Sequence, residues 1–426
     1  MLSLFPFAQV APRIFFLDMN AFFAAIEQQE KPHLRGRPMI VVPMLGTDYT
    51  CAIAASYEAK KLGIRTGTAV RLARGVTPDL QIVEARPELY LQYHARLVDI
   101  LNHHFAATKV LSVDEMSCRI PALVRSPEQE AKLALAVKQQ IGRELGPCLT
   151  CSIGIAPNVF LAKVAGDRQK PDGLTIWGEA DLPEALFAVR LPDLPGIGPA
   201  MKRRLARLGI TTVEELYAAS SDQLRAAWNS VVGERWWYML RGSHECDYQP
   251  PQAAQRKSVG HSHVLPPAWR TLAGAADILV QLAAKATRRL RAYQMAAAAL
   301  DIRVEYRKAR SSRACLWRRR SGRHLHANDD ATWLKVLRPM LSALPDMGTD
   351  APPQWVGIVF TDLLACKDVN LSLFEDPVAK SRLALTVDAL NEKFGHVVDL
   401  LPIYEHYGQV PKRIPFGTPE EIPTSK

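Results

Sequence analysis

The stretches RIFFLDMNAFFAAI, residues 13–26, and VLSVDE, residues 110–115, decide the fold of this chain. In each stretch a short apolar segment leads into acidic residues, Asp18 in the first and the pair Asp114-Glu115 in the second. Apolar runs of this length are typical of strands that are buried on both faces. We therefore expect each stretch to contain such a strand, ending at its acids.

The expected strands cover residues 13–17 and 110–113. If they are neighbours in one sheet, the three carboxylates that follow them lie at the same sheet edge. Like charges this close are unfavourable unless cations neutralise them, and a pair of divalent ions is a common arrangement in phosphoryl transfer. Acidic residues are common at strand ends, so this spacing alone does not establish a metal site.

The following residues complete a split α/β unit. Apolar periodicity predicts a helix over 128–145, alternation predicts a strand over 149–155, and Asn158 is a good N-cap for a second helix. Cys151 lies on one face of that strand, and no second Cys or His pair has zinc spacing, so we expect a core residue rather than a ligand. Glycines punctuate the segment of about 31–75, which looks like an inserted lobe.

Residues 191–216, LPDLPGIGPAMKRRLARLGITTVEEL, predict two short helices joined by a tight turn at 195–198. Such a helix-hairpin-helix turn can present backbone N–H groups to a phosphate, as helix N-termini do. We expect Gly196 and Gly198 to bind a nucleic-acid backbone in this way. Cations that favour the same partner follow the turn: Lys202, Arg203, Arg204 and Arg207. An ordinary helical hairpin with a glycine turn is the alternative.

Residues 244–256 contain Pro250-Pro251 and little periodicity, which indicates a linker. Beyond it the periodicities predict a β-α-β-β-α-β order, a ferredoxin-like arrangement. The expected strands are 257–264, 298–306, 314–320 and 354–361, and the expected helices are 270–293 and 331–344. A further helix is expected over 381–394.

Residues 307–323, which include the connection between the second and third of these strands and the third strand itself, are strongly basic. They contain Trp317 together with Arg307, Lys308, Arg310, Arg313, Arg318, Arg319, Arg320 and Arg323. Cations without interleaved acids repel one another unless an anion is near. We expect Arg318, Arg319 and Arg320 to bind nucleic acid, and a solvated run of charge is the alternative.

Composition indicates a globular protein, and its positive charge suits a polyanionic partner; mild basicity without such a partner, which is common among soluble proteins, is the alternative. The 426 residues include 53 Lys+Arg against 43 Asp+Glu, a net charge of +10, and 48% apolar residues. Seven scattered cysteines fit a reducing compartment. The apolar N-terminus lacks a cationic start, and no run approaches the ~18 apolar residues of a membrane span. We therefore expect a cytoplasmic protein without membrane attachment.

Six motifs, in order along the chain, resemble those of the Y-family DNA polymerases, and most of all the bacterial DNA polymerase IV type. They are FFLDMNAFFAAIE at 15–27, AASYEAKKLGIRTG at 54–67, SVDE at 112–115, CSIGIAPNVFLAKVAGDRQKPDG at 151–173, the hairpin at 195–198, and KSVGHSHVLPP at 257–267. The resemblance implies an error-tolerant, lesion-bypassing polymerase.

The resemblance also implies an α+β multidomain fold shaped like a right hand. It has a ferredoxin-like palm, small fingers, a helix-hairpin-helix thumb and a ferredoxin-like little finger of β-α-β-β-α-β order. The implied divisions are palm 1–30 and 77–176, fingers 31–76, thumb 177–243, linker 244–256, little finger 257–365, and a C-terminal tail 366–426 with a possible clamp-binding peptide.

For the reaction, the resemblance implies that Asp18, Asp114 and Glu115 are the catalytic carboxylates and bind two Mg²⁺ ions, with the Met19 carbonyl assisting. Phe23 is the implied steric gate, whose ring takes the space that a ribose 2′-hydroxyl needs. Filling of the core is the alternative role for this ring.

The implied triphosphate contacts are Tyr57, Lys60 and Lys170. Lys60 stands where the family usually has an arginine, which is a better fork for phosphate. Ala54 stands where a hydroxyl is common, and Asn20 replaces a frequent, non-essential acid. These departures leave the metal carboxylates intact.

Residues 370–374, NLSLF, resemble a sliding-clamp-binding peptide. Asn370 replaces the usual glutamine, and Leu371, Leu373 and Phe374 are apolar plugs for a groove; a simple strand end is the alternative. The implied partners are primer-template DNA, deoxynucleoside triphosphates and a sliding clamp, for a chain expected to act as a monomer.

The leading hypothesis is an active polymerase without proofreading, since no exonuclease domain is visible in the sequence. Its rival is a catalytically weak or inactive polymerase-fold scaffold that recruits repair proteins to the clamp. Such scaffolds characteristically lose metal carboxylates, and this chain keeps all three. A helix-hairpin-helix binder whose carboxylates serve a nuclease is a third possibility, and the palm, fingers and little-finger motifs argue against it.

Overall fold

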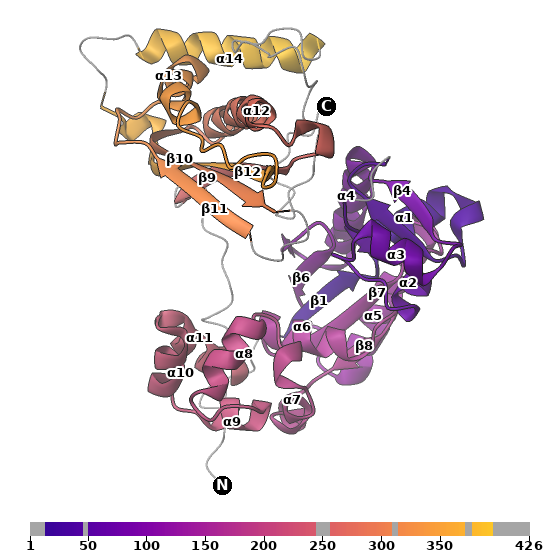
Figure 1. The fold of residues 1–426 in the computed structure, drawn as a ribbon. Coiled ribbons are helices and arrows are strands. Elements are labelled where there is room, and N and C mark those ends of the chain that lie inside the picture. The colour runs from indigo at the N-terminus through magenta and orange to yellow at the C-terminus, as the bar shows by residue number, and fades with distance from the viewer. Residues whose placement is uncertain (1–12, 46–49, 244–255, 309–313, 371–376, 395–426) are drawn as a thin grey trace. The chain divides into compact units, whose positions relative to one another are not determined.

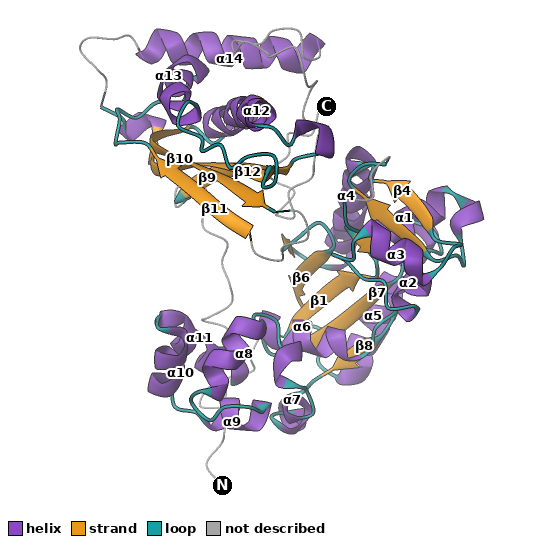
Figure 2. Ribbon diagram, in the orientation of Figure 1, coloured by secondary structure: helices purple, strands orange, loops and turns teal. Residues whose placement is uncertain are grey.

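The computed structural model describes residues 13–45, 50–243, 256–308, 314–370 and 377–394. The chain forms two compact units, one with the described residues up to 243 and one with those from 256 onward (Figure 1). Both units combine sheets with helices (Figure 2), which confirms the predicted α+β class. None of the described helices is long and apolar enough to cross a membrane.

The first unit is built on a five-stranded sheet with β1 at its centre. Across the sheet the strands are β5 (Thr108–Val110), β6 (Glu115–Arg119), β1 (Ile14–Met19), β7 (Cys151–Ala156) and β8 (Leu174–Ile176). β1 pairs antiparallel with β6 and β7, and β8 pairs parallel with β7. The apolar strand predicted around Asp18 is thus the central strand.

Four helices pack on this sheet: α1 (Phe22–Glu30), α4 (Pro87–His104), α5 (Pro127–Glu144) and α6 (Val159–Arg168). Phe15 and Leu17 pack into one core with α1, α4 and α5, whereas Phe16 packs into another core with α6. Because β1 is covered on both faces, its residues are apolar without alternation. Cys151 is 1% exposed, so its predicted place in the core is confirmed.

α6 lies unusually close to the sheet. A Cβ on Gly154 of β7 would be 1.9 Å from the carbonyl oxygen of Ala162, so only glycine fits this position. The helix begins after Asn158, whose side chain accepts a hydrogen bond from the N–H of Leu161 at 2.8 Å. The predicted N-cap is therefore confirmed.

The prediction of a strand over 110–113 is wrong. β5 ends at Val110 and β6 begins at Glu115, so the residues between them form the turn of a hairpin. The Oγ of Ser112 accepts hydrogen bonds from the N–H groups of Asp114 (3.3 Å) and Glu115 (3.0 Å). Local bonds of this kind favour a turn over an extended strand, and apolar periodicity does not report them.

A three-stranded sheet lies in the segment predicted as an inserted lobe. Its strands, in order, are β3 (Ala54–Ala55), β2 (Met39–Val42) and β4 (Gln81–Glu84), accompanied by α2 (Tyr57–Lys61), α3 (Val70–Val76) and the short η1 (Pro32–Leu34). Buried Ile40, Val42 and Ile64 belong to a core of its own. The sheet reaches Glu84, beyond about residue 75, where the sequence analysis placed the end of the inserted lobe.

Short helices complete the first unit: η2 (Glu179–Asp181), α7 (Glu184–Phe187), η3 (Leu191–Asp193), α8 (Pro199–Ala206), α9 (Val213–Ala218), α10 (Ser221–Trp228) and α11 (Val231–Leu240). The predicted glycine turn joins η3 to α8. Gly196 has φ +96°, a conformation that other residues rarely adopt, and a Cβ there would be 3.1 Å from the Trp236 ring.

The second unit follows the predicted β-α-β-β-α-β order. Its elements are β9 (Ser258–Val264), η5 (Pro267–Trp269), α12 (Leu272–Ala292), β10 (Met295–Arg307), β11 (Ala314–Arg320), α13 (Asp330–Leu341), β12 (Pro353–Ala365) and η6 (Cys366–Asp368). The strands lie in the order β11-β10-β12-β9, with antiparallel neighbours. Ile302, Trp333 and Phe360 are fully buried in the core that this sheet shares with α12 and α13.

The last described helix, α14 (Pro377–Phe394), begins earlier than the predicted 381. It is tied to the second unit by Arg291 of α12, whose side chain is 2% exposed. The Arg291 guanidinium lies 2.6 Å from Asp388 of α14 and 3.3 Å from Asp330. A buried guanidinium needs such partners, so the ion pairs fix this helix on the unit. Residues 244–255 of the predicted linker lie outside the described residues.

Candidate active site

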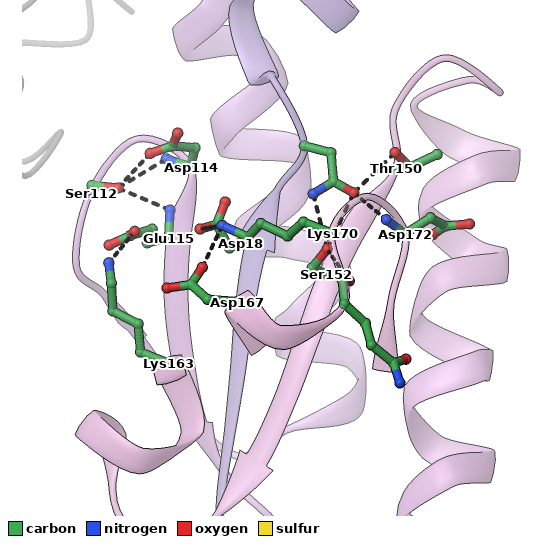
Figure 3. A network of polar contacts seen from close by, with 12 residues as sticks. Asp18, Ser112, Asp114, Glu115, Thr150, Ser152, Lys163, Asp167, Lys170 and Asp172 are labelled. Carbon is green, nitrogen blue, oxygen red and sulfur yellow. Dashed lines mark hydrogen bonds and ion pairs between the residues drawn. The ribbon is translucent and has the colours of Figure 1, made fainter. Parts of the chain in front are cut away.

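The five-stranded sheet brings the three predicted carboxylate residues to one end of β1. Asp18 lies opposite Glu115 in the register of β1 and β6, and the N–H of Met19 donates to the carbonyl of Asp114 at 3.0 Å. The sequence placed both sets of acids at strand ends. In the structure they come from the end of one strand, from a hairpin turn and from the start of the next strand (Figure 3).

Asp114 and Glu115 each have a partner of their own. Ser112 Oγ lies 2.6 Å from Asp114 Oδ1 and donates to it, which fixes the carboxylate in the turn. Lys163 of α6 forms an ion pair with Glu115. This lysine was not singled out from the sequence, although it lies on the helix that packs against β1.

Asp18 is paired with Lys170, from the turn that follows α6. The Nζ of Lys170 lies 2.5 Å from Asp18 Oδ2 and 2.7 Å from Asp167 Oδ1. Burial raises the pKa of Asp18 to about 6, and repulsion from Asp114 and Glu115 adds to the rise, although Lys170 opposes it. Burial disfavours the charge of Lys170, but its two carboxylate partners outweigh burial and raise its pKa.

The carboxylates are neighbours but are turned towards these separate partners. Within the ranges that the structure describes, no three His, Cys, Asp or Glu side chains are grouped closely enough to hold a metal ion as they stand. The backbone positions nevertheless meet the main expectation from the sequence, since Asp18 and Glu115 are strand partners and Met19 is bonded to Asp114.

A pocket lies beside Asp18. All the residues predicted to contact a nucleotide line this pocket: Phe23, Tyr57, Lys60 and Lys170. Ala54 and Asp114 line it as well. The Nζ of Lys60 lies 4.3 Å from the ring centroid of Tyr57. Burial, and then the nearby Lys170, lower the pKa of Lys60, while burial raises the pKa of Tyr57. The pocket thus gathers cations and a hydroxyl beside the carboxylates, as a polyphosphate ligand requires.

The position of Phe23 is compatible with both predicted roles, core packing and the steric gate, and the gate stays a prediction. It is 7% exposed, belongs to the core around β1, and stacks on Tyr90 with ring centroids 4.3 Å apart and an interplanar angle of 13°. It also lines the pocket. One face of the Phe23 ring is held by packing in the core, while the ring also borders the pocket.

Asn20 is a site residue whose role the sequence did not reveal. It is 3% exposed and makes side-chain hydrogen bonds with Thr150, Ser152 and the N–H of Asp172. Asn20 lies just past the end of β1 at Met19, so strand alternation gave no signal for it.

Comparison with known proteins agrees with this geometry. The model of the impB/mucB/samB family matches residues 17–167, that of the family's C-terminal domain matches 256–373, and the thumb domain of DNA polymerase-iota matches 192–243. The DNA polymerase IV of Moorella thermoacetica is 36% identical over 279 residues, which cover 65% of this chain and 69% of that relative. The chain belongs to the Y-family of DNA polymerases.

Other relatives place this Y-family polymerase with the DNA polymerase IV, or DinB, type. The DNA polymerase IV of Bacillus velezensis is 27% identical over 389 residues, 90% of each chain. Two solved structures share the fold at 22% identity, a Y-family DNA polymerase chimera (TM-score 0.67) and DinB from Sulfolobus solfataricus (TM-score 0.50), each covering 84% of this chain and 100% of its own. The predicted family, fold and DNA-directed, translesion polymerase class are confirmed.

Some of the side chains predicted to contact nucleic acid in this Y-family polymerase are exposed, and others are paired with acids. Lys202 and Arg203 are exposed on α8, directly after the Gly196–Gly198 turn. In the second unit, Arg318 forms a two-pronged pair with buried Asp301 (2.8 and 2.9 Å), and Arg320 lies 3.1 Å from Asp362. Two other strands of the same sheet, β10 and β12, therefore supply acids that are absent from the basic stretch itself. Arg319 is exposed, and no ion pair is recorded for it among the described residues.

Of the predicted clamp-binding residues, the structure describes only Asn370, which follows η6. Leu371, Leu373 and Phe374 lie outside the described residues, so the peptide stays a prediction from the sequence.

Proposed function

We propose that this polymerase extends a primer on template DNA, one deoxynucleotide at a time and without proofreading, at the pocket beside Asp18. The observation that carries the proposal is the register of β1 and β6, which sets Asp18 opposite Glu115 and beside Asp114. Carboxylates at such a position, next to a cation-lined pocket, suit phosphoryl transfer between a hydroxyl and a triphosphate.

The charge at this site supports the binding of two Mg²⁺ ions. Lysine ammonium groups pair with Asp18 and Glu115, so cations already meet carboxylates at this end of β1, and burial together with repulsion from Asp114 and Glu115 raises the pKa of Asp18. Asp18, Asp114 and Glu115, with the Met19 carbonyl, are the residues that would hold the ions. When bound, the ions supply activation of the primer 3′-hydroxyl and stabilisation of the leaving pyrophosphate.

The remaining pocket residues bind and select the nucleotide. Lys60 and Lys170 hold the negative charge of the triphosphate, and the Tyr57 hydroxyl donates to it. The Phe23 ring, fixed by its stack on Tyr90, excludes a ribose 2′-hydroxyl.

The wider assignment follows the family architecture. The palm (1–30 and 77–176), fingers (31–76) and thumb (177–243) act on primer-template DNA, with Gly196, Gly198, Lys202 and Arg203 binding its backbone. A linker (244–256) leads to the little finger (257–365), where Arg318, Arg319 and Arg320 add contacts. Within the tail (366–426), residues 370–374 engage a sliding clamp. The protein acts as a cytoplasmic monomer.

The scaffold alternative has no observation in its favour. An inactive polymerase-fold protein has no need to keep three carboxylates beside a pocket lined by cations, and all of these groups are present here.

Primer extension tests the proposal. With Mg²⁺ and all four nucleotides, the wild type should extend a primed template, undamaged or damaged. Asp114→Ala should abolish extension while DNA affinity is retained, because the substitution removes a proposed metal ligand and leaves the basic DNA contacts in place. Asp79→Ala, which removes an exposed acid before β4, is the matched control and should extend normally. Failure of the wild type at generous metal and nucleotide concentrations would leave the scaffold role in its place.

A further inference from the structure

The turn that carries Lys170 is tightly constrained. Residues 169–173, QKPDG, connect α6 to β8. Asp172 has a left-handed φ of 56°, and a Cβ on Gly173 would lie 1.8 Å from the carbonyl oxygen of Gln169. The position of the Lys170 ammonium group beside Asp18 therefore depends on what fixes this turn.

Asn20 holds both ends of the turn (Figure 3 shows its partners Thr150, Ser152 and Asp172). Its Oδ1 accepts from the N–H of Asp172 at 2.7 Å and from the Thr150 hydroxyl at 3.2 Å. Its Nδ2 donates to Ser152 Oγ at 3.0 Å, and that hydroxyl donates to the Gln169 carbonyl at 3.3 Å. The buried Asn20 amide thus binds the end of the turn directly, at Asp172, and binds its beginning, at Gln169, through Ser152.

Lys138 of α5 holds the turn from another side. Its Nζ lies 2.6 Å from the carbonyl oxygen of Asp172 and 2.8 Å from its carboxylate, and its side chain is 14% exposed. The N–H, carbonyl and side chain of Asp172 are all engaged by two residues from outside the turn. Such complete engagement leaves the turn little freedom to rotate.

We propose that Asn20 is a positioning residue for nucleotide binding, with Lys138 as the second anchor. The inference rests on the proposed function of Lys170. Two contacts join the end of β1 to the turn. The Lys170 ammonium group forms an ion pair with Asp18, and the Asp172 N–H donates a hydrogen bond to Asn20. Asn20 thereby sets the separation between the carboxylate that meets the metal ions and the ammonium group that meets the triphosphate.

The chemistry explains why an amide stands here. Asn20 accepts from Asp172 and Thr150 and donates to Ser152, which leaves the Ser152 hydroxyl proton for the Gln169 carbonyl. An ionised carboxylate cannot donate, so Ser152 would have to turn its proton towards residue 20 and release Gln169. An aspartate would also add a fourth negative charge two residues from Asp18. Asn20 and Tyr57 both line the nucleotide pocket.

Steady-state kinetics with a primed template tests this role. Asn20→Asp and Lys138→Met should each raise the KM for the incoming nucleotide by about tenfold, because small displacements of a binding group are costly. The kcat at saturating nucleotide should stay within about twofold, since the interaction acts on binding. Lys132→Met, which removes an exposed lysine of the same helix, is the matched control and should change neither value.

A double-mutant cycle separates positioning from folding. In a Lys170→Ala background, Asn20→Asp should raise KM no further, because the group it positions is gone. An unchanged KM in the single variants, an additive effect in the cycle, or a parallel loss of DNA affinity and thermal stability would overturn the role of Asn20.

Hydrogen–deuterium exchange at the Asp172 amide gives a readout that does not need catalysis. Asn20→Ala should expose this N–H to faster exchange, whereas Lys132→Met should not. If the wild type fails to extend primers, the proposed function falls, while exchange still decides whether Asn20 holds the turn. Unchanged protection of Asp172 in Asn20→Ala would refute that hold even in an active enzyme.

Discussion

Replacing Phe23 with alanine should reduce the preference of the polymerase for deoxynucleotides over ribonucleotides. The ring is 7% exposed, is backed by Tyr90 at 4.3 Å and lines the nucleotide pocket, so it cannot retreat from an added hydroxyl. Forcing an extra group into a packed site costs about 1–3 kcal/mol. Since 1.36 kcal/mol corresponds to tenfold in rate, selectivity should fall by about 5- to 150-fold.

The assay is the ratio of kcat/KM for a deoxynucleotide to that for the matching ribonucleotide. Phe23→Ala should also lower the free energy of unfolding, by about 3 kcal/mol, the lower end for a buried phenylalanine, because one side of the ring already faces a pocket. Phe105→Ala is the control, since Phe105 is 3% exposed in the same core but does not line the pocket. It should lose stability and keep its selectivity. Unchanged selectivity in Phe23→Ala, or an equal loss in Phe105→Ala, would refute the gate.

Three further predictions concern stability and the tail. Glu27 is fully buried and hydrogen-bonded to Arg86 and Tyr90, and these bonds outweigh the effect of burial and lower the pKa of Glu27 from 4.5. The contribution of ionised Glu27 to the free energy of unfolding is therefore present above about pH 4.5 and is lost as the pH falls through the lowered pKa. Denaturant titrations should therefore show the advantage of wild type over Glu27→Gln shrinking at acid pH, and a constant difference would contradict the ion pair. Gly154→Ala should destabilise by about 3 kcal/mol, because its Cβ meets a backbone oxygen; Gly142→Ala, in α5 with open space around it, should instead stabilise by about 0.5–1 kcal/mol. Thermal melts that rank the two substitutions in the opposite order would contradict the packing of α6. Deleting residues 370–374 should reduce processivity only when a sliding clamp is present, and an equal loss without the clamp would assign the peptide to folding.

The sequence predicted the elements whose signal is local. The apolar run around Phe16 marked the central strand, Asn158 marked the start of α6, and alternation marked the strands of the second unit. Periodicity succeeds in these places because burial is regular along each element. The carboxylates expected to bind metal were assigned through motif resemblance, since spacing alone could not distinguish them from ordinary strand-end acids.

What the sequence could not give depends on contacts between distant residues. Ser112 turns a predicted strand into a hairpin through hydrogen bonds that are invisible to periodicity. Arg318 looked like a free cation until the pairing of β10 and β11 placed Asp301 beside it. The hydrogen bond from the Asp172 N–H to Asn20 joins residues 152 positions apart in the sequence, so no local pattern could predict it.

Direct measurement of metal binding tests the central claim that Asp18, Asp114 and Glu115 form the metal site. Mn²⁺ binding, followed by electron paramagnetic resonance with primer-template DNA and a non-hydrolysable nucleotide, should reveal about two ions per molecule, as a two-metal site requires. Asp114→Asn should weaken at least one of them while Asp79→Asn leaves both intact. Stoichiometry and affinity that are identical in wild type and Asp114→Asn would contradict the account.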